Sequence, residues 1–408
     1  CARRPSSRMP PHTTAQRPPR PPARAPAARG TLTGRLSRCA LFLALLLALG
    51  AAAFPLLLSY AVGGWVAKHT SRFPFAVVDI PRLEGRVAVV TGGNTGIGLE
   101  TVRELARKGA EVVLTARDLA KGEAAAERVR ASVAKDLEAA GLPGAKVRAM
   151  RLDLASFASI SAFASQFLAL GLPLHALVLN AGVMKSPGAA FVGRPLHYGY
   201  EETRDGFEAH IGVNHLGHFL LYTLLEGALK ASAPSRVVAV SAAAEVSAYA
   251  EGIRPDLWHA RGTDYEDGRA YGQSKLANIL FARELAHRLH GTGVAAFSCH
   301  PGVIRTELAR HMEAEFEAQA RAKGLVAQAA SAAFSQLFAL ALMSPADGAL
   351  TQLMLATSER PLLPGGYYWP VGDPVQPKHP QAHNLTLQRL LWAWSEEAVR
   401  GALPAEGE

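Results

Sequence analysis

The sequence predicts an α/β fold, a doubly wound parallel sheet with helices on both faces. Short apolar runs of the kind that form buried parallel strands alternate along the chain with segments of helical periodicity. A glycine-rich turn joins the first run to the first helix, as in strand–turn–helix units that bind nucleotides. Strands that alternate with helices imply parallel pairing, because each crossover helix brings the chain back to the same end of the sheet.

The predicted elements follow one another in a regular order. Residues 86–90 form the first strand, residues 91–98 the glycine-rich turn, and an apolar-faced helix follows until Gly109 ends it. The second strand covers residues 111–115. A later helix begins at Ser156 and runs to about residue 170. The remaining strands are predicted at residues 147–153, 174–179, 236–241 and 294–299.

The charge distribution argues against a nucleic-acid-binding protein. The chain of 408 residues carries a formal net charge of +9, but its first 78 residues hold eleven Lys and Arg and no acid. The remainder therefore holds 32 bases against 34 acids, so a basic nucleic-acid surface is not expected there. The three cysteines, Cys1, Cys39 and Cys299, are too far apart in sequence for a disulfide framework or a metal site. His215 and His218 lack an acidic neighbour of the usual metal-site kind, so no metal is expected.

The N-terminal residues predict a membrane anchor ahead of the globular domain. Residues 1–38 are rich in Pro, Ala and Arg and are expected to form a disordered basic leader. Residues 39–67 are 29 positions without a charge, which is long enough for a transmembrane helix. A cleaved signal is the alternative, because small residues at 50–53 offer a cleavage site. The globular domain is expected over residues 79–408, in the endoplasmic reticulum or an organelle envelope, with the compartment left open.

The end of the second predicted strand indicates the cofactor. Glycines between a strand and a helix N-terminus let backbone N–H groups approach a pyrophosphate, whose charge the helix dipole favours. NAD-specific folds usually place an acid at the end of the next strand, whereas an Arg accommodates the 2′-phosphate of NADP. Ala116 and Arg117 hold these positions, so NADP(H) is predicted. The alternative is that Arg117 faces solvent while Asp118 caps the next helix.

Tyr271 and Lys275 are the predicted acid–base pair. They are four residues apart, so they share one face of a helix. An ammonium beside a phenol favours the phenolate, and Lys275 is therefore expected to lower the pKa of Tyr271 and make it a general acid or base. The alternative is that the two side chains merely share a solvated face.

Together these motifs resemble those of the short-chain dehydrogenase/reductase family, over about residues 83–400. Residues 274–285 and 300–308 are similar to the retinol dehydrogenase branch, which also includes WW-domain oxidoreductases and the plastid-envelope 32-kDa translocon component. The segments that carry the resemblance are Thr91-Gly-X-X-X-Gly-Ile-Gly98, Asn180-Ala-Gly182, Val213-Asn-His-Leu-Gly-His-Phe219, Tyr271-X-X-X-Lys275 and His300-Pro-Gly302.

The resemblance implies a role for each matching residue. Tyr271 would be the acid–base residue, Lys275 would bind the cofactor ribose and lower the tyrosine pKa, and Asn214 would hold a water in the proton relay. Together with Arg117, the implied cofactor-binding residues are Gly92, Asn94, Gly96, Ile97, Gly98, Asp153, Leu154, Asn180, Ala181, Gly182, Tyr271, Lys275, Pro301, Gly302 and Thr306.

Two positions depart from the family pattern. Leu179 stands where many members have an additional Asn before Asn180. The fifth strand ends in Val-Ser241-Ala242, where the family reads Val-Ser-Ser and uses the second Ser to polarise the substrate carbonyl. Ser241 is the candidate for this catalytic role, but neighbouring strand residues point to opposite faces, so it needs a local bulge or a one-residue slip. Ser247 is a further candidate, and loss of such a donor typically costs about 10²–10³ in rate.

Three further segments carry structural predictions. Residues 185–203 form a long loop of the kind that borders substrate sites. Residues 307–341 are expected to form a mobile helical lid over an apolar pocket, with ordinary core packing as the alternative. Residues 390–394, Leu-Leu-Trp-Ala-Trp, predict a C-terminal docking helix.

Two hypotheses for the function follow. The first is a membrane-anchored, single-domain Rossmann-type enzyme that transfers hydride between NADP(H) and a carbonyl/alcohol pair on a lipophilic retinoid, steroid or aldehyde. The alternative is an NADP(H)-binding protein of weak activity that serves as a redox-sensing scaffold at a membrane. The expected partners are a lipophilic small molecule and a membrane, nucleic acid is not expected, and a homodimer is left open.

Overall fold

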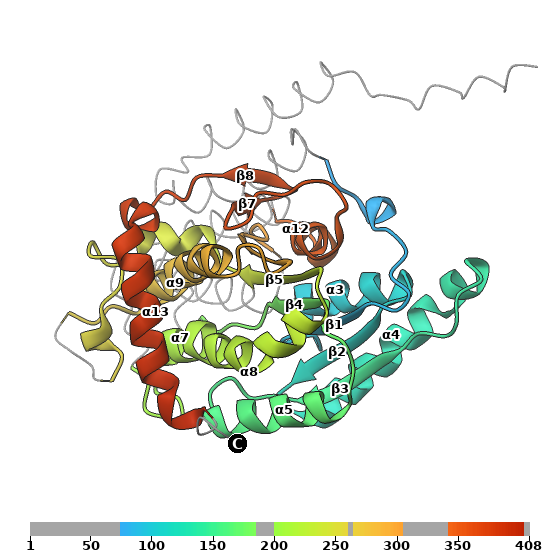
Figure 1. Ribbon diagram of the computed structural model, residues 1–408, viewed down its shortest axis with the longest axis horizontal. Coiled ribbons are helices and arrows are strands. Elements are labelled where there is room, and N and C mark those ends of the chain that lie inside the picture. The colour runs from blue at the N-terminus through green and yellow to red at the C-terminus, as the bar shows by residue number, and fades with distance from the viewer. Residues whose placement is uncertain (1–73, 185–199, 260–263, 305–341, 404–408) are drawn as a thin grey trace, which may run out of the picture. The chain divides into compact units, whose positions relative to one another are not determined.

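The computed structural model describes residues 74–184, 200–259, 264–304 and 342–403. All described residues belong to one compact unit, Ala51–Glu408. Their centre is an eight-stranded sheet of order β3-β2-β1-β4-β5-β6-β7-β8 (Figure 1). Neighbouring strands are parallel except at the β7–β8 edge. The strands are β1 (Val87–Val90), β2 (Glu111–Ala116), β3 (Val147–Arg151), β4 (Ala176–Leu179), β5 (Ser235–Val240), β6 (Val294–Cys299), β7 (Tyr367–Trp369) and β8 (Asp373–Val375).

Helices cover both faces of this sheet (Figure 1), which confirms the predicted doubly wound α/β fold. On one side are α3 (Gly96–Arg107), α4 (Leu119–Ala139) and α12 (Pro345–Thr357). On the other are α5 (Phe157–Ala169), α8 (Gly217–Ala231), α9 (Asp267–Arg288) and α13 (Leu385–Val399). The short helical turns are η2 (Val77–Asp79), α7 (Ala209–Ile211), η3 (Gly212–Leu216), η4 (Ala243–Ser247), η5 (Pro255–Leu257), η6 (Pro380–His383) and η7 (Arg400–Ala402).

The strands are apolar on both faces because helices bury both. In β2, Val113 belongs to the core on the side of α8 and α9, whereas Val112 and Leu114 belong to the core on the side of α3 and α12. This alternation follows from the two-residue period of a strand. The six predicted strands are all present. The two short strands β7 and β8 at one end of the sheet were not predicted, because three residues are too few to show a period.

Helix starts and stops follow local side-chain chemistry. Asp118 caps α4 by accepting a hydrogen bond from the Lys121 N–H at 3.2 Å, as the sequence analysis proposed. Ser156 caps α5 in the same way, accepting from the Ser159 N–H at 3.3 Å. Gly109, with φ of +90°, follows the end of α3 in a conformation that favours glycine. These caps fix where each helix leaves the sheet.

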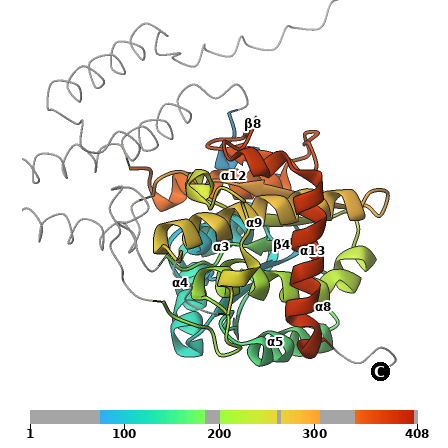
Figure 2. The ribbon, with the colours of Figure 1, turned by 90° about the vertical axis from the view of Figure 1, so that its left-hand side faces the viewer.

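The C-terminal segment forms helix α13, which lies across the outside of α9 and α8 (Figures 1 and 2). The indole of Trp392 stacks on Phe281, with ring centroids 6.0 Å apart, and meets the edge of Phe219 at 4.9 Å. The guanidinium of Arg288 lies 4.2 Å from the centroid of the same indole. The predicted docking helix is therefore confirmed, and Trp392 packs its aromatic ring against both α9 and α8.

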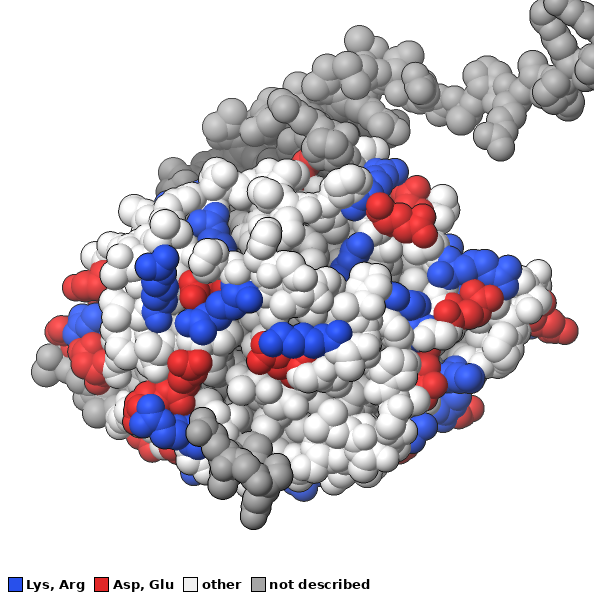
Figure 3. All heavy atoms as spheres, viewed as in Figure 1, with Lys and Arg blue, Asp and Glu red and all other residues white. Residues whose placement is uncertain are grey.

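Several predicted segments lie outside the described residues. They are the leader (1–38), the predicted membrane span (39–67), the predicted lid (307–341) and most of the loop at 185–203. Within the described ranges, no helix is long and apolar enough to cross a bilayer. On the face of the protein shown in Figure 3, basic and acidic side chains are interspersed, in keeping with the nearly neutral charge of the chain beyond residue 78.

Replacing Trp392 by Ala is expected to lower the free energy of unfolding by about 3–5 kcal/mol, because it leaves a cavity between α13 and α9. Chemical denaturation measures the change. The matched control is Leu390→Ala on the same helix: Leu390 is 43% exposed, so its truncation should cost less than about 0.5 kcal/mol. Equal losses for the two variants would mean that Trp392 does not hold α13 in place.

Candidate functional site

A glycine turn between β1 and α3 forms a cradle for an anion. Gly92 and Gly96 have φ of +63° and +56°, the left-handed region that favours glycine. A Cβ on Gly98 would press on the Gly92 carbonyl oxygen and lie 2.6 Å from Asn180 Nδ2, so the position requires glycine. The Thr95 side chain makes no capping hydrogen bond, which leaves the first N–H groups of α3 for a phosphate.

The hydroxyl of Thr91, at the end of β1, ties the cradle to the end of β4. It accepts hydrogen bonds from the backbone N–H groups of Asn180 (2.8 Å) and Ala181 (2.9 Å). The Asn180 side chain donates back to the Thr91 carbonyl oxygen at 2.9 Å. Asn180 therefore holds two adjacent strand ends together, and Leu179 stays fully within the core.

His218 on α8 is a third partner of Thr91. The Nε2 of His218 lies 3.0 Å from the Thr91 hydroxyl oxygen. Its Nδ1 donates to the Asn214 carbonyl oxygen at 3.1 Å, so in the neutral ring Nε2 accepts the Thr91 hydroxyl proton. Burial lowers the pKa of His218 to about 4, which keeps the ring neutral at physiological pH. His218 thus links the glycine turn to the segment that carries Asn214, a role that its sequence position did not reveal.

Asn214 lies in a π-helical turn, η3, at the start of α8. Its Oδ1 accepts from the Val183 N–H at 2.7 Å, and its Nδ2 donates to the Val183 carbonyl (3.0 Å) and to Ser274 Oγ on α9 (3.0 Å). A Cβ on Gly182 would lie 3.1 Å from Asn214 Oδ1 and 3.3 Å from Lys275 Nζ. The backbone after β4, the π-turn and α9 therefore meet at one point. Such π-turns are frequent at functional sites.

Tyr271 and Lys275 lie on the buried face of α9, so the alternative of a solvated face is wrong. Lys275 Nζ lies 5.5 Å from the centroid of the Tyr271 ring and donates to the Val240 carbonyl at 3.4 Å. Within the described part of the chain, the Tyr271 hydroxyl has no hydrogen-bond partner. The phenol is therefore positioned by packing and is free to bind a reacting oxygen.

The predicted effect of Lys275 on Tyr271 is wrong for this arrangement. Burial raises the pKa of Tyr271 and lowers the pKa of Lys275 to about 8. The physical reason is desolvation, which disfavours the charged phenolate and the charged ammonium alike. The ammonium of Lys275 lies over the ring of Tyr271.

The comparisons with known proteins agree with this geometry. The family model "short chain dehydrogenase" matches residues 86–253. Retinol dehydrogenase 11 of Homo sapiens is 41% identical over 317 residues, which is 76% of this chain and 85% of that protein. The chain belongs to the short-chain dehydrogenase family. Within the family it lies in the retinol dehydrogenase-like branch, since retinol dehydrogenase 12 of Homo sapiens is 48% identical over 232 residues, 56% of this chain. That match spans 65% of the length of retinol dehydrogenase 12.

Solved structures show the same fold. A protein from Mycobacterium paratuberculosis has a TM-score of 0.56 at 30% identity, covering 80% of this chain and 97% of that one. L-sorbose reductase from Gluconobacter frateurii, crystallised with NADPH and L-sorbose, has a TM-score of 0.53 at 19% identity, covering 72% and 97%. At that identity the second likeness concerns the fold alone.

The residues predicted to bound the adenosine of a cofactor lie at the ends of β2 and β3. Asp153 Oδ1 accepts from the Ala155 N–H at 3.1 Å, and Leu154 is buried. A Cβ on Gly217 would lie 2.7 Å from the Leu154 carbonyl oxygen, so α8 packs closely on this strand end. Arg117 is exposed immediately after β2.

In the structure, the hydroxyl groups of both candidate serines bond to backbone carbonyl groups of helices. Ser241 Oγ donates to the Lys275 carbonyl at 2.6 Å, and Ser247 Oγ lies 2.7 Å from the Ala244 carbonyl and 3.4 Å from that of Gly268. Each hydroxyl hydrogen is thus used within the protein, and donation to a substrate carbonyl would require breaking that bond. Ala242 is partly exposed in extended backbone at the end of β5, with φ of −153°.

The end of β6 supplies Pro301 and Gly302, whereas Thr306 lies outside the described residues. Gly302 has φ of +101°, and a Cβ there would press on Met343 Sδ. The neighbouring His300 is buried, and neither of its ring nitrogens has a hydrogen-bond partner in the described structure. Burial lowers the pKa of His300 to about 3, with Lys275 as a further cause. A buried imidazole without a partner, close enough to Lys275 to feel its charge, fits a site built to hold a polar ligand such as a nicotinamide nucleotide.

The histidines of residues 210–218 have structural partners. His215 Nε2 lies 2.8 Å from Ser395 Oγ, which joins the π-turn to the docking helix α13. Among the described residues, no group of three His, Cys, Asp or Glu gathers as ligands for a metal ion.

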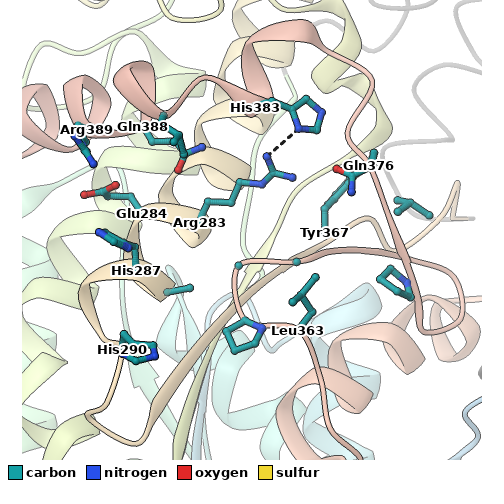
Figure 4. Close-up of a pocket in the computed structure, with 17 residues that line it drawn as sticks. Arg283, Glu284, His287, His290, Leu363, Tyr367, Gln376, His383, Gln388 and Arg389 are labelled. Carbon is teal, nitrogen blue, oxygen red and sulfur yellow. Dashed lines mark hydrogen bonds between the residues drawn. The ribbon is translucent and has the colours of Figure 1, made fainter.

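A pocket of about 840 Å³ lies away from these residues, between α9, α13 and the segment around β7 and β8 (Figure 4). Figure 4 shows Arg283 and His287 on α9, His290 in the turn that follows it and Arg389 on α13 around the pocket. None of the predicted site residues lines it. The predicted site residues Tyr271 and Lys275 lie nearer the other end of α9, where Lys275 Nζ is close to Gly182.

Replacing Gly98 by Ala is expected to weaken dinucleotide binding by about tenfold or more, because the added Cβ collides with the turn that positions the N–H groups. Fluorescence titration of the reduced cofactor measures the dissociation constant. The control is Gly227→Ala within α8, where a Cβ meets open space and the affinity should stay unchanged. Unchanged affinity for Gly98→Ala as well would place the dinucleotide elsewhere.

Proposed function

We propose that this chain is an NADP(H)-dependent oxidoreductase that interconverts a carbonyl and an alcohol on a lipophilic small molecule of retinoid, steroid or aldehyde type. One observation carries the proposal. Lys275 Nζ and the Asn214 amide both lie beside Gly182, in the backbone that Thr91 ties to the glycine cradle. Lys275 also lies over the ring of Tyr271, whose hydroxyl has no partner among the described residues. Such a combination of an acid–base group and a dinucleotide cradle suits hydride transfer.

The residues of the chain divide the work between proton transfer and positioning. When bound, a nicotinamide cofactor supplies or accepts the hydride. In the direction of reduction, Tyr271 donates its phenolic proton to the carbonyl oxygen. Lys275, whose pKa is lowered to about 8 by burial, gives up a proton readily near neutral pH and resupplies the phenol. Asn214, held on both sides of its amide by Val183, keeps the π-turn in position for a relaying water.

The preference for NADP(H) rests on the end of β2. Ala116 is buried there and has no carboxylate to bind ribose hydroxyls, whereas Arg117 is exposed and presents a guanidinium suited to a 2′-phosphate. Asp118, the nearest acid, is engaged in capping α4. The exposed Arg117 and the absence of a carboxylate at Ala116 therefore favour a ribose that carries a 2′-phosphate.

The lipophilic substrate is proposed from the relatives, whose names state action on retinol. The uncharged segment 39–67 would hold the enzyme at a membrane, where such substrates dissolve.

Tyr271→Phe is expected to lower kcat by about 10²–10⁴-fold, because it removes the proton donor and keeps the ring. NADPH oxidation by the purified full chain is followed with retinals, steroid ketones and medium-chain aldehydes. Cofactor affinity, measured separately, should change by less than about tenfold, since one hydrogen bond at most is lost. Undiminished turnover in Tyr271→Phe would remove this residue from the mechanism.

A second candidate function is an NADP(H)-binding redox sensor of weak activity. Ala242 favours it, because the hydroxyls of Ser241 and Ser247 both bond to helix backbone and no other serine follows β5 closely. NADPH binding without turnover on any carbonyl of the panel would support the sensor over the enzyme.

Ala242→Ser separates the two candidates. If the chain is an enzyme that lacks one carbonyl-polarising donor, the added hydroxyl should raise kcat by about tenfold or more, since such donors contribute about 10²–10³. Ser241→Ala is the matched control: it removes the bond to the Lys275 carbonyl and adds no donor, so it should not raise kcat. Turnover absent from both the wild type and Ala242→Ser would favour the sensor. Wild-type turnover without a gain in Ala242→Ser would mean that the reaction proceeds without a serine at this position.

A further inference from the structure

A buried carboxylate, Glu208, sits behind the proposed acid–base residue. It is 2% exposed and caps the short helix α7, where its Oε2 accepts from the Ile211 N–H at 2.9 Å. Its Oε1 lies 2.6 Å from His210 Nδ1 and accepts from the Tyr265 hydroxyl at 3.2 Å. Burial opposes ionisation, but the hydrogen bond from His210 and the other donors outweigh it and lower the pKa of Glu208. The carboxylate is therefore ionised.

This ionised carboxylate fixes the tautomer of His210. An ionised carboxylate is acceptor-only, so Nδ1 of His210 must carry a hydrogen and donate it. The pair thus has the arrangement in which a carboxylate orients a histidine by its Nδ1–H group, known from catalytic triads. Both side chains are almost fully buried, His210 at 1%. Placing such a pair in a core offers little stability over an apolar pair.

The other side of His210 meets Tyr271. The two ring centroids are 5.9 Å apart, and the planes cross at 70°, an edge-on contact. Lys275 lies on the same phenol, 5.5 Å from its centroid. The ring of Tyr271 is therefore held by an imidazole and an ammonium, while its hydroxyl bonds to no described residue.

The charged and titratable groups around this contact come from several elements. They are Glu208 at the start of α7, Tyr265 and Asp267 at the start of α9, Lys275 further along α9, and Tyr249 after η4. Burial is the first cause of the raised pKa values of Tyr265, Tyr249 and Tyr200. The charge of Glu208 is a further, smaller cause for each of the three. Burial alone raises the pKa of Tyr271, which is the phenol that His210 contacts. The imidazole thus stands between the carboxylate and the reacting phenol.

We propose that Glu208 and His210 form a positioning pair for Tyr271, in which Glu208 orients the imidazole and the imidazole both orients the phenol and offsets the carboxylate charge. This proposal rests on the proposed role of Tyr271 as acid–base residue. It assigns to the segment before Asn214 a part in setting the acidity of the phenol, in a chain that has Ala242 where a hydroxyl is expected.

The test compares two substitutions with opposite electrostatic effects. Glu208→Gln removes a negative charge behind the phenol, which favours the phenolate and lowers the pH midpoint of alcohol oxidation by about 0.5–1 unit. His210→Phe keeps an aromatic edge but leaves the carboxylate without its offsetting Nδ1–H group, which raises the midpoint by a similar amount, about 0.5–1 unit. Tyr265→Phe is the matched control: it removes one hydrogen bond to the same carboxylate and no contact with Tyr271, so its midpoint stays at the wild-type value.

A second readout does not depend on turnover. Tyrosine labelled with ¹³C at Cζ reports ionisation of each phenol by NMR, and Tyr271→Phe assigns the signal. With oxidised cofactor added, the Tyr271 midpoint should move down in Glu208→Gln, up in His210→Phe, and not at all in Tyr265→Phe.

The outcomes separate this proposal from the proposed function. The wild type could show no turnover while Glu208→Gln and His210→Phe still shift the Tyr271 midpoint in opposite directions by NMR. That result would contradict the proposed enzyme activity and support the positioning pair. Equal midpoints in all variants, or shifts of the same sign in Glu208→Gln and His210→Phe, would overturn the pair. A loss of kcat in both variants at every pH with an unmoved midpoint would reduce Glu208 and His210 to packing.

Discussion

Three segments that are far apart in the chain meet at the hydroxyl of Thr91, and the candidate site depends on that meeting. The hydroxyl accepts from the backbone after β4 and lies within hydrogen-bonding distance of His218 on α8. Through His218 it reaches Asn214, and through Asn214 it reaches α9. Because a hydroxyl has one hydrogen and two lone pairs, these partners satisfy it completely and fix its orientation. The glycine cradle and the acid–base residues are thereby placed relative to each other.

Burial sets the acid–base character of this site more strongly than pairing does. Lys275, Tyr271, His218 and His300 all lie in the core, and for each of them burial is the first cause of the pKa shift. Desolvation keeps the histidines neutral and makes the lysine a weaker base, while it holds the phenol in its protonated form. A protonated phenol beside a readily deprotonated amine suits proton donation to a carbonyl oxygen. The same surroundings disfavour a free phenolate, which is why the groups behind Tyr271 matter.

Much of the architecture was predictable because it depends on local patterns. The six apolar runs became strands, the glycine turn joined β1 to α3, and Asp118 capped α4. Trp392 docked its helix on α9. Each of these follows from periodicity, from a backbone conformation or from a cap within a few residues. The strands β7 and β8 escaped prediction because they are short, and because the pairing of β7 with β6 joins segments far apart in the chain.

The sequence by itself determined the fold class, the cradle glycines and the shared helix face of Tyr271 and Lys275. It did so because strand and helix periods, left-handed glycines and an i, i+4 spacing are properties of neighbouring residues. Only the tertiary structure decided the direction of the tyrosine pKa shift, the bond of Ser241 to the Lys275 carbonyl and the contact of His210 with Tyr271. Those depend on what surrounds a side chain after distant segments have packed, and burial, distance and hydrogen-bond partners are not set by residues adjacent in the chain.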